Sequence, residues 1–225
     1  MNYICRMNEH EQLKFSQATY FFDYTHPIIQ TKIKEWTSEA TSLKEKAIEL
    51  YYAIRDGYYY NPYKINFAAE YAKSSDIINR KEGHCLDKAT LLISCCRAIG
   101  IPSKLHLVKV KNHIAVEKLV EAYGTDELTP HAFAELYIDG KWVKATPAFN
   151  RSLCDLLNVD VLEFDGETDS LFQEYDKDGG QFMEYLEDYG CFDDLPMEFI
   201  VENMKAHYPG IERYAETDEL VEIIV

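Results

Sequence analysis

The chain has 225 residues, of which 47% are hydrophobic, and its formal net charge at pH 7 is −16. This length and composition favour a folded globular protein with a sizeable core, and the net negative charge makes nucleic acids and anionic membrane surfaces poor partners. No apolar run is long enough to cross a membrane, and the start, Met1–Arg6, has no secretory pattern. The six cysteines form no Cys-x-x-Cys pair, which is typical of reduced thiols, so we expect a cytoplasmic protein.

The N-terminal part is expected to hold a short arm and a helix. Leu13–Ser16 and then Tyr20–Phe22 read as a leading strand or arm. Ser42, with Glu45 three residues later, predicts a capping box, and Gly57 closes the helix that follows. An aromatic loop, Tyr58–Tyr63, comes next; clustered tyrosines usually lie at the edge of a core, but beside a cleft they can line a substrate groove.

Cys85 follows Gly83 and His84 and opens an apolar run with a helical period, so its sulfur is predicted to lie at a helix N-terminus. Unpaired backbone N–H groups and the helix dipole favour negative charge there and can lower a cysteine pKa from about 8.5 toward about 3.5–7.5. The apolar residues lie on one face of this helix, which predicts that the helix packs on a core. Gly100 ends the helix. A second interpretation is a buried structural cysteine that merely begins a helix. We expect the adjacent His84 to be a surface side chain, since neighbouring residues on a helix point apart.

After this helix the hydrophobic period changes to that of strands. Lys104–Val110 alternates between apolar and polar residues, His113–Glu117 reads as a further strand, and residues 118–130 read as a polar loop. Asp139-Gly140 is a two-residue hairpin turn signal between two more strands. A helix followed by an antiparallel sheet predicts an α+β fold.

The turn at Asp139-Gly140 fixes which residues of the hairpin face each other. Counting outward from it, Phe133 faces Thr146 and His131 faces Ala148. His131 and Thr146 are therefore predicted to be diagonal neighbours on one face, about 7–8 Å apart at the backbone. The side chains on the opposite face of the hairpin are small and aliphatic, which predicts that this face packs against a helix.

The end of the chain differs in charge from the rest. Residues 155–225 contain 3 Lys+Arg and 21 Asp+Glu, whereas residues 1–154 contain 20 and 18. An acidic region can bind a basic partner or shield a site, but it is most often a solvated surface. Its many aromatic residues predict a region that is integrated into the fold, with helical pieces over Leu171–Tyr189.

Three separated blocks carry a resemblance to a known family. They are Gly83-His84-Cys85, then Arg97-Ala98-Ile99-Gly100-Ile101-Pro102, then the segment from His131 to Val143. In this order they resemble the transglutaminase-like superfamily, which belongs to the wider papain-like group of Cys-His-Asp enzymes. The resemblance implies a helix with the cysteine at its N-terminus, packed on an antiparallel sheet. It divides the chain into an N-terminal arm and helix within the core domain (1–64), a transglutaminase-like core (65–150) and an acidic C-terminal extension packed on the core (151–225).

The resemblance also assigns roles to residues. The family's nucleophile falls on Cys85 and its base on His131, while the aspartate that orients the base falls on Thr146, before Pro147. A threonine hydroxyl can accept a hydrogen bond from an imidazole, but it carries no charge to stabilise an imidazolium. Asn150 is a weaker substitute, because an amide oxygen can also orient a histidine.

These assignments imply a cysteine-dependent acyl-transfer enzyme with a protein or peptide substrate, most simply a protease or amidase that transfers the acyl group to water. The alternative acceptor of the acyl group is an amine, as in a transglutaminase. The alternative from a different class is a catalytically inactive binding module that keeps the fold. We expect no cofactor and no metal, because Cys85, Cys95 and Cys96 lie on one helix and cannot converge on one zinc ion. The sequence predicts no particular oligomeric state.

Overall fold

A computed structural model describes residues 7–38, 42–211 and 221–222, so the expectation for the start, Met1–Arg6, lies outside the described residues. Among the described residues no helix is both long and apolar enough to span a bilayer. The elements in chain order are α1 (Glu9–Ser16), α2 (Pro27–Trp36), α3 (Leu43–Gly57), β1 (Tyr59–Tyr60), β2 (Lys64–Ile65), the 3-10 helix η1 (Ala69–Ala72), α4 (Ser74–Ile77), β3 (Glu82–Gly83), α5 (Cys85–Ala98), β4 (Ser103–Asn112), α6 (Glu117–Tyr123), β5 (Glu127–Ile138), β6 (Lys141–Ala145), α7 (Arg151–Leu157), β7 (Met183–Phe192), α8 (Met197–His207) and β8 (Val221–Glu222).

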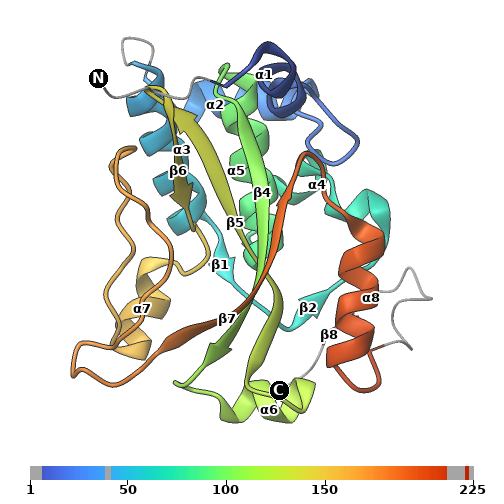
Figure 1. The fold of residues 1–225 in the computed structure, drawn as a ribbon, viewed down its shortest axis with the longest axis vertical. Helices are drawn as coiled ribbons and strands as arrows, with labels where there is room; N and C mark the ends of the chain where they lie inside the picture. Colours follow the sequence, from blue (N-terminus) through green and yellow to red (C-terminus); the bar gives the residue numbers. More distant parts are fainter. Residues whose placement is uncertain (1–6, 39–41, 212–220, 223–225) are drawn as a thin grey trace.

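The centre of the fold is a four-stranded sheet in the order β6-β5-β4-β7, in which all neighbouring strands are antiparallel. The helix α5 packs against β4 and β5 and also against α2 and α3 (Figure 1). Every residue from Cys85 to Arg97 is buried as a result, although the sequence shows only one apolar stripe. The predicted α+β fold, with the cysteine at the N-terminus of a helix on an antiparallel sheet, is confirmed.

The β5–β6 hairpin has the predicted register. Residues 134–138 pair with residues 141–145 as counted from the turn. Asp139 (φ 51°) and Gly140 (φ 85°) both have positive φ, as a type I′ turn requires. The ladder ends at Ala134 and Ala145, so the predicted pairs Phe133–Thr146 and His131–Ala148 are not part of it. The backbone N–H of Thr146 donates instead to the carbonyl of Ser170, outside β5.

Two segments expected to be strands are not strands. Leu13–Ser16 belongs to α1, which begins with a capping box between Asn8 and Glu11. The expected strand at His113–Glu117 is a loop that leads into α6, and the expected polar loop at 118–130 holds most of α6 and the start of β5. These segments are too short for hydrophobic periodicity to distinguish helix from strand.

The acidic C-terminal region contributes an edge strand to the central sheet. β7 pairs with β4, and β8 pairs with β2. The predicted helical pieces over Leu171–Tyr189 are wrong, because this stretch is non-helical and enters β7 at Met183. α8 follows this strand. The division of the chain at residues 64 and 150 stays a prediction.

A buried lysine fixes the first turns of α5. Lys88 is 1% exposed, and its Nζ donates to the carbonyls of Arg55 (2.8 Å), Tyr58 (2.9 Å) and Ala148 (2.7 Å). These bonds join α5 to the end of α3 and to the segment after β6. The end of the helix that carries Cys85 is thereby held relative to the β5–β6 hairpin.

Candidate active site

Cys85 is the first residue of α5, and His84 caps this helix. His84 Nδ1 accepts from the Asp87 backbone N–H (3.4 Å), and Asp87 Oδ2 accepts from the His84 backbone N–H (3.1 Å). A Cβ at Gly83 would lie 3.0 Å from the Asp87 Cβ, so glycine permits this close approach. His84 is therefore a capping residue whose side chain is 16% exposed, and the expected surface position is wrong.

The Cys85 sulfur lies against the backbone of β5. The residue is 8% exposed, and burial raises the pKa of its thiol to about 12 against the opposing hydrogen bonds from the backbone N–H groups of Ala132 and Leu86. The lowered pKa expected at a helix N-terminus is not found, because desolvation of the thiolate outweighs the backbone dipoles. Cys85 is a neutral thiol at pH 7.

His131 immediately precedes Ala132, so it lies next to the group that contacts the sulfur. It is 2% exposed, and burial lowers the pKa of its imidazole to about 4. Within the described residues Nδ1 has no hydrogen-bond partner, and no hydrogen bond joins the imidazole to the Cys85 sulfur. The structure thus places Cys85 and His131 at the same peptide group, the one between His131 and Ala132. The two side chains do not form a thiolate–imidazolium pair.

Neither candidate for the third position orients His131. Thr146 is 3% exposed, and its Oγ1 has no hydrogen-bond partner in the part of the chain that the structure describes. Asn150 is engaged elsewhere, since its Oδ1 accepts from the Tyr60 backbone N–H (2.9 Å) and its Nδ2 donates to Ser152 Oγ (2.7 Å). In the described part of the chain, His131 Nδ1 and Thr146 Oγ1 are therefore both buried without a hydrogen-bond partner.

A small pocket beside Cys85 is lined by residues from distant parts of the sequence. Its volume is about 30 Å³, which holds roughly one water molecule and excludes a peptide. Tyr60 of the aromatic loop, Tyr123 of α6 and Tyr208 after α8 line it together with Met204. Burial raises the pKa of all three phenols, and a charge on Cys85 would raise it further. Sequence reasoning indicated only the aromatic loop; no local signal marks the other residues.

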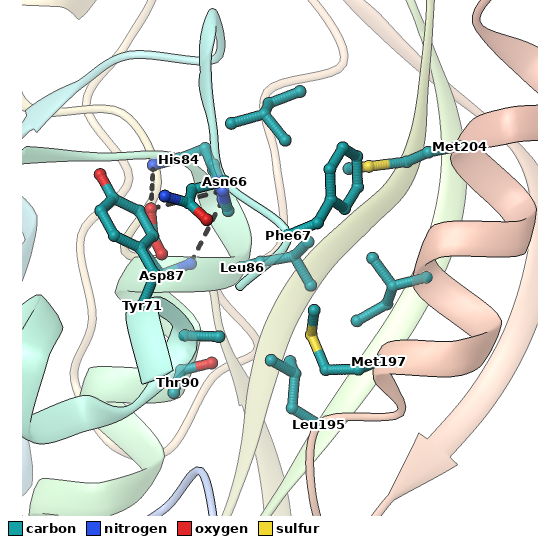
Figure 2. A pocket seen from close by; sticks show the side chains of 13 residues that line it. Asn66, Phe67, Tyr71, His84, Leu86, Asp87, Thr90, Leu195, Met197 and Met204 are labelled. Carbon is teal, nitrogen blue, oxygen red and sulfur yellow. Dashed lines mark hydrogen bonds and ion pairs between the residues drawn. The ribbon is translucent and has the colours of Figure 1, made fainter. Parts of the chain in front are cut away.

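A second pocket adjoins the first and is shown in Figure 2. His84 and Asp87, which are joined to each other, form its polar side, and α8 contributes Met197 and Met204 to its apolar side. Met204 lines both pockets. α8 therefore covers the start of the helix that carries Cys85.

Comparisons with known proteins identify the region that contains this site. A profile of the Transglutaminase-like superfamily matches residues 30–147, which include Cys85, His131 and Thr146. Among solved structures, a candidate cysteine protease from Cytophaga hutchinsonii is similar, with 18% sequence identity and a TM-score of 0.48. The match covers 65% of this chain and 45% of that one, so it spans less than half of that protein's length. No curated protein matches the sequence.

Proposed function

Since this chain belongs to the transglutaminase-like superfamily, we propose that it is a cysteine-dependent acyl-transfer enzyme that hydrolyses peptide or amide bonds through Cys85 and His131. One observation carries the proposal: the Cys85 sulfur lies at the backbone N–H of Ala132, directly after His131. A thiol at a helix N-terminus, beside a strand that carries an imidazole, has the two groups that nucleophilic acyl transfer requires.

The unpaired imidazole supports a functional role. A buried polar atom without a hydrogen bond costs about 1–3 kcal/mol, and among the described residues His131 Nδ1 has no partner to offset this cost. An apolar side chain of similar size would avoid it. Local conflicts of this kind concentrate at functional sites, so we assign the His131 imidazole to proton transfer rather than to packing.

In the proposed reaction His131 acts as a base, because the resting thiol and imidazole are both neutral. As the Cys85 sulfur bonds to the substrate carbonyl carbon, its proton passes to His131. The imidazolium gives that proton to the leaving amine as the C–N bond breaks, which leaves a thioester. His131 then takes a proton from water as the water oxygen attacks the thioester, and it returns this proton to the departing sulfur. The backbone N–H of Cys85, at the helix N-terminus, is the proposed donor to the oxyanion.

Substrate binding must enlarge this site. The pocket beside Cys85 has a volume of about 30 Å³, and Met204 and Tyr208 are among the side chains that close it. We infer that a protein or peptide substrate displaces these side chains before the acyl group reaches the sulfur. Water is the proposed acceptor; an amine in its place would turn the same thioester intermediate into a transglutaminase reaction.

The test is a screen of short fluorogenic peptide amides with wild type, Cys85→Ser and His131→Ala. We expect turnover in wild type that both substitutions abolish, together with an acyl adduct on Cys85 detected by peptide mass spectrometry. His113→Ala is the control for loss of an imidazole, since His113 lies outside the site and its side chain is 27% exposed. Turnover that survives in Cys85→Ser would contradict the proposal.

A catalytically inactive binding module is the second candidate, and the third position of the triad favours it. Thr146 carries no charge, and Asn150 is held by Tyr60 and Ser152. In a serine protease the loss of charge from the orienting carboxylate lowers the rate by about 10⁴-fold. If no peptide amide is turned over but wild type and Cys85→Ser bind the same peptide equally well, the chain is a module of this kind.

A further inference from the structure

A cluster of histidine, glutamate and cysteine side chains lies on the central sheet, apart from the Cys85 pocket. His106 comes from β4, Glu135 from β5 and Cys191 from β7, and β4 lies between the other two strands (Figure 1). His106 Nδ1 is 2.5 Å from Glu135 Oε1 and 3.4 Å from Cys191 Sγ, and this Sγ is 3.5 Å from the same Oε1. Three potential metal ligands from three strands therefore converge.

The strand register explains the convergence. His106 pairs directly with Cys191 on β7, and Glu135 is its diagonal neighbour on β5. β7 is irregular just before Cys191, where Gly190 has φ 82° and the register shifts. Asp188 and Cys191 are three positions apart and would point to opposite faces of a regular strand, but the bulge lets both reach His106.

The imidazole of His106 is held in one orientation. Its Nε2 is 2.8 Å from Asp188 Oδ1, and its ring stacks on Phe133 with the centroids 4.6 Å apart. The other ring nitrogen of a metal-binding histidine usually donates to a carboxylate, a backbone carbonyl or water, which fixes the tautomer and the orientation of the ring. The near nitrogen, Nδ1, faces Oε1 of Glu135, and the Cys191 thiol donates to the same oxygen, so two protons meet at this one acceptor.

We propose that His106, Glu135 and Cys191 bind a zinc ion through Nδ1, Oε1 and Sγ. Imidazole nitrogen, carboxylate oxygen and thiolate are the ligands that zinc takes, at about 2.0–2.3 Å. The separations among the three atoms leave a common point about 2 Å from each of them. Binding releases the protons of Nδ1 and of the thiol, and the ion then bonds to all three atoms at once.

The surroundings of the cluster fit an ion with three protein ligands. Lys104 Nζ is 3.0 Å from Glu135 Oε2, so it holds the second carboxylate oxygen and leaves Oε1 for the ion. A hollow of about 320 Å³, lined by His106, Lys144 and Asp188 among others, lies beside the cluster. A water molecule from this hollow can supply the fourth ligand.

Cobalt(II) is the probe for this site, because it occupies zinc sites and a bound thiolate gives a charge-transfer absorption band. Titration of the full chain with Co²⁺ is expected to produce this band with a single-site end point, and Zn²⁺ is expected to remove it. Cys191→Ser should lose the band, while Cys85→Ser should keep it. Asp188→Asn should weaken binding about 10–100-fold through the imidazole it orients.

Thermal unfolding of each variant without metal separates loss of a ligand from loss of the fold. Three results would overturn the proposal: no Co²⁺ binding to folded wild type, Co²⁺ binding without a thiolate band, and a thiolate band that persists in folded Cys191→Ser.

Discussion

The sulfur of Cys85 lies at the backbone N–H of Ala132, so the peptide group that joins His131 to Ala132 separates the nucleophile position from the base position. Burial acts on both side chains in the direction that removes charge. It raises the pKa of the Cys85 thiol to about 12 and lowers the pKa of the His131 imidazole to about 4. The resting site is therefore a neutral pair, and its reactivity depends on what enters the pocket.

The first prediction concerns alkylation of Cys85 by iodoacetamide. With a thiol pKa near 12, the thiolate fraction at neutral pH is small, so Cys85 should react more slowly than exposed Cys191 by on the order of tenfold or more. Peptide mass spectrometry across a pH series gives both rates in one sample. Fast labelling of Cys85 below pH 8 that His131→Ala abolishes would show instead that the two residues form an ion pair.

The second prediction concerns stability at acid pH. The pKa of His131 is about 4 in the folded chain against 6.5 for a free histidine, so the unfolded chain binds the proton more readily between these values. Protonation of His131 therefore takes no stability from the fold above pH 6.5 and destabilises the fold as the pH falls toward 4. Relative to His131→Asn, wild type should lose on the order of 3 kcal/mol of unfolding free energy over this range.

Urea unfolding of both proteins at several pH values measures this difference, and the comparison cancels the titration of carboxylates that the two proteins share. Parallel pH profiles would mean that His131 is accessible to protons in the folded state.

The third prediction concerns α8 as the cover of the Cys85 pocket. Met204 lines this pocket, so Met204→Ala should open it and speed the alkylation of Cys85 severalfold. Met197→Ala is the matched control, because Met197 lies on the same helix but lines only the neighbouring pocket. Equal rates in the two variants would show that α8 does not limit access to the sulfur.

The hairpin was predictable because a two-residue turn leaves no freedom in the register. Asp139-Gly140 alone fixes the pairing as far as Ala134 and Ala145. The departure at Thr146 was not predictable, because it depends on a hydrogen bond from its backbone N–H to Ser170, a residue far along the chain.

The sequence predicts the position of Cys85 correctly but its pKa in the wrong direction. The helix terminus is a local property of residues 83–87, whereas burial of the sulfur depends on β5, α6 and α8. For the same reason Tyr123 and Tyr208 could not be assigned to the pocket. The cluster around His106 depends on the bulge at Gly190, which no spacing in the sequence indicates.

The last prediction restores the charge that the triad lacks. Thr146 directly follows Ala145, the last residue of the β5–β6 ladder, and its Oγ1 and His131 Nδ1 both lack hydrogen-bond partners among the described residues. In Thr146→Asp a carboxylate should reach Nδ1, raise the pKa of His131 and favour the imidazolium. Alkylation of Cys85 at pH 7 should then increase about tenfold or more.

Thr146→Asn is the matched control, because its amide oxygen can accept the same hydrogen bond without a charge. If charge is what the site lacks, Thr146→Asp should exceed Thr146→Asn in labelling rate and should lose this advantage in a double variant with His131→Ala. Thermal unfolding shows whether each variant folds, since a buried carboxylate without a partner would destabilise the chain. Folded variants with equal labelling rates would show that residue 146 does not orient His131, and the Cys85 site would then act without a third residue at this position.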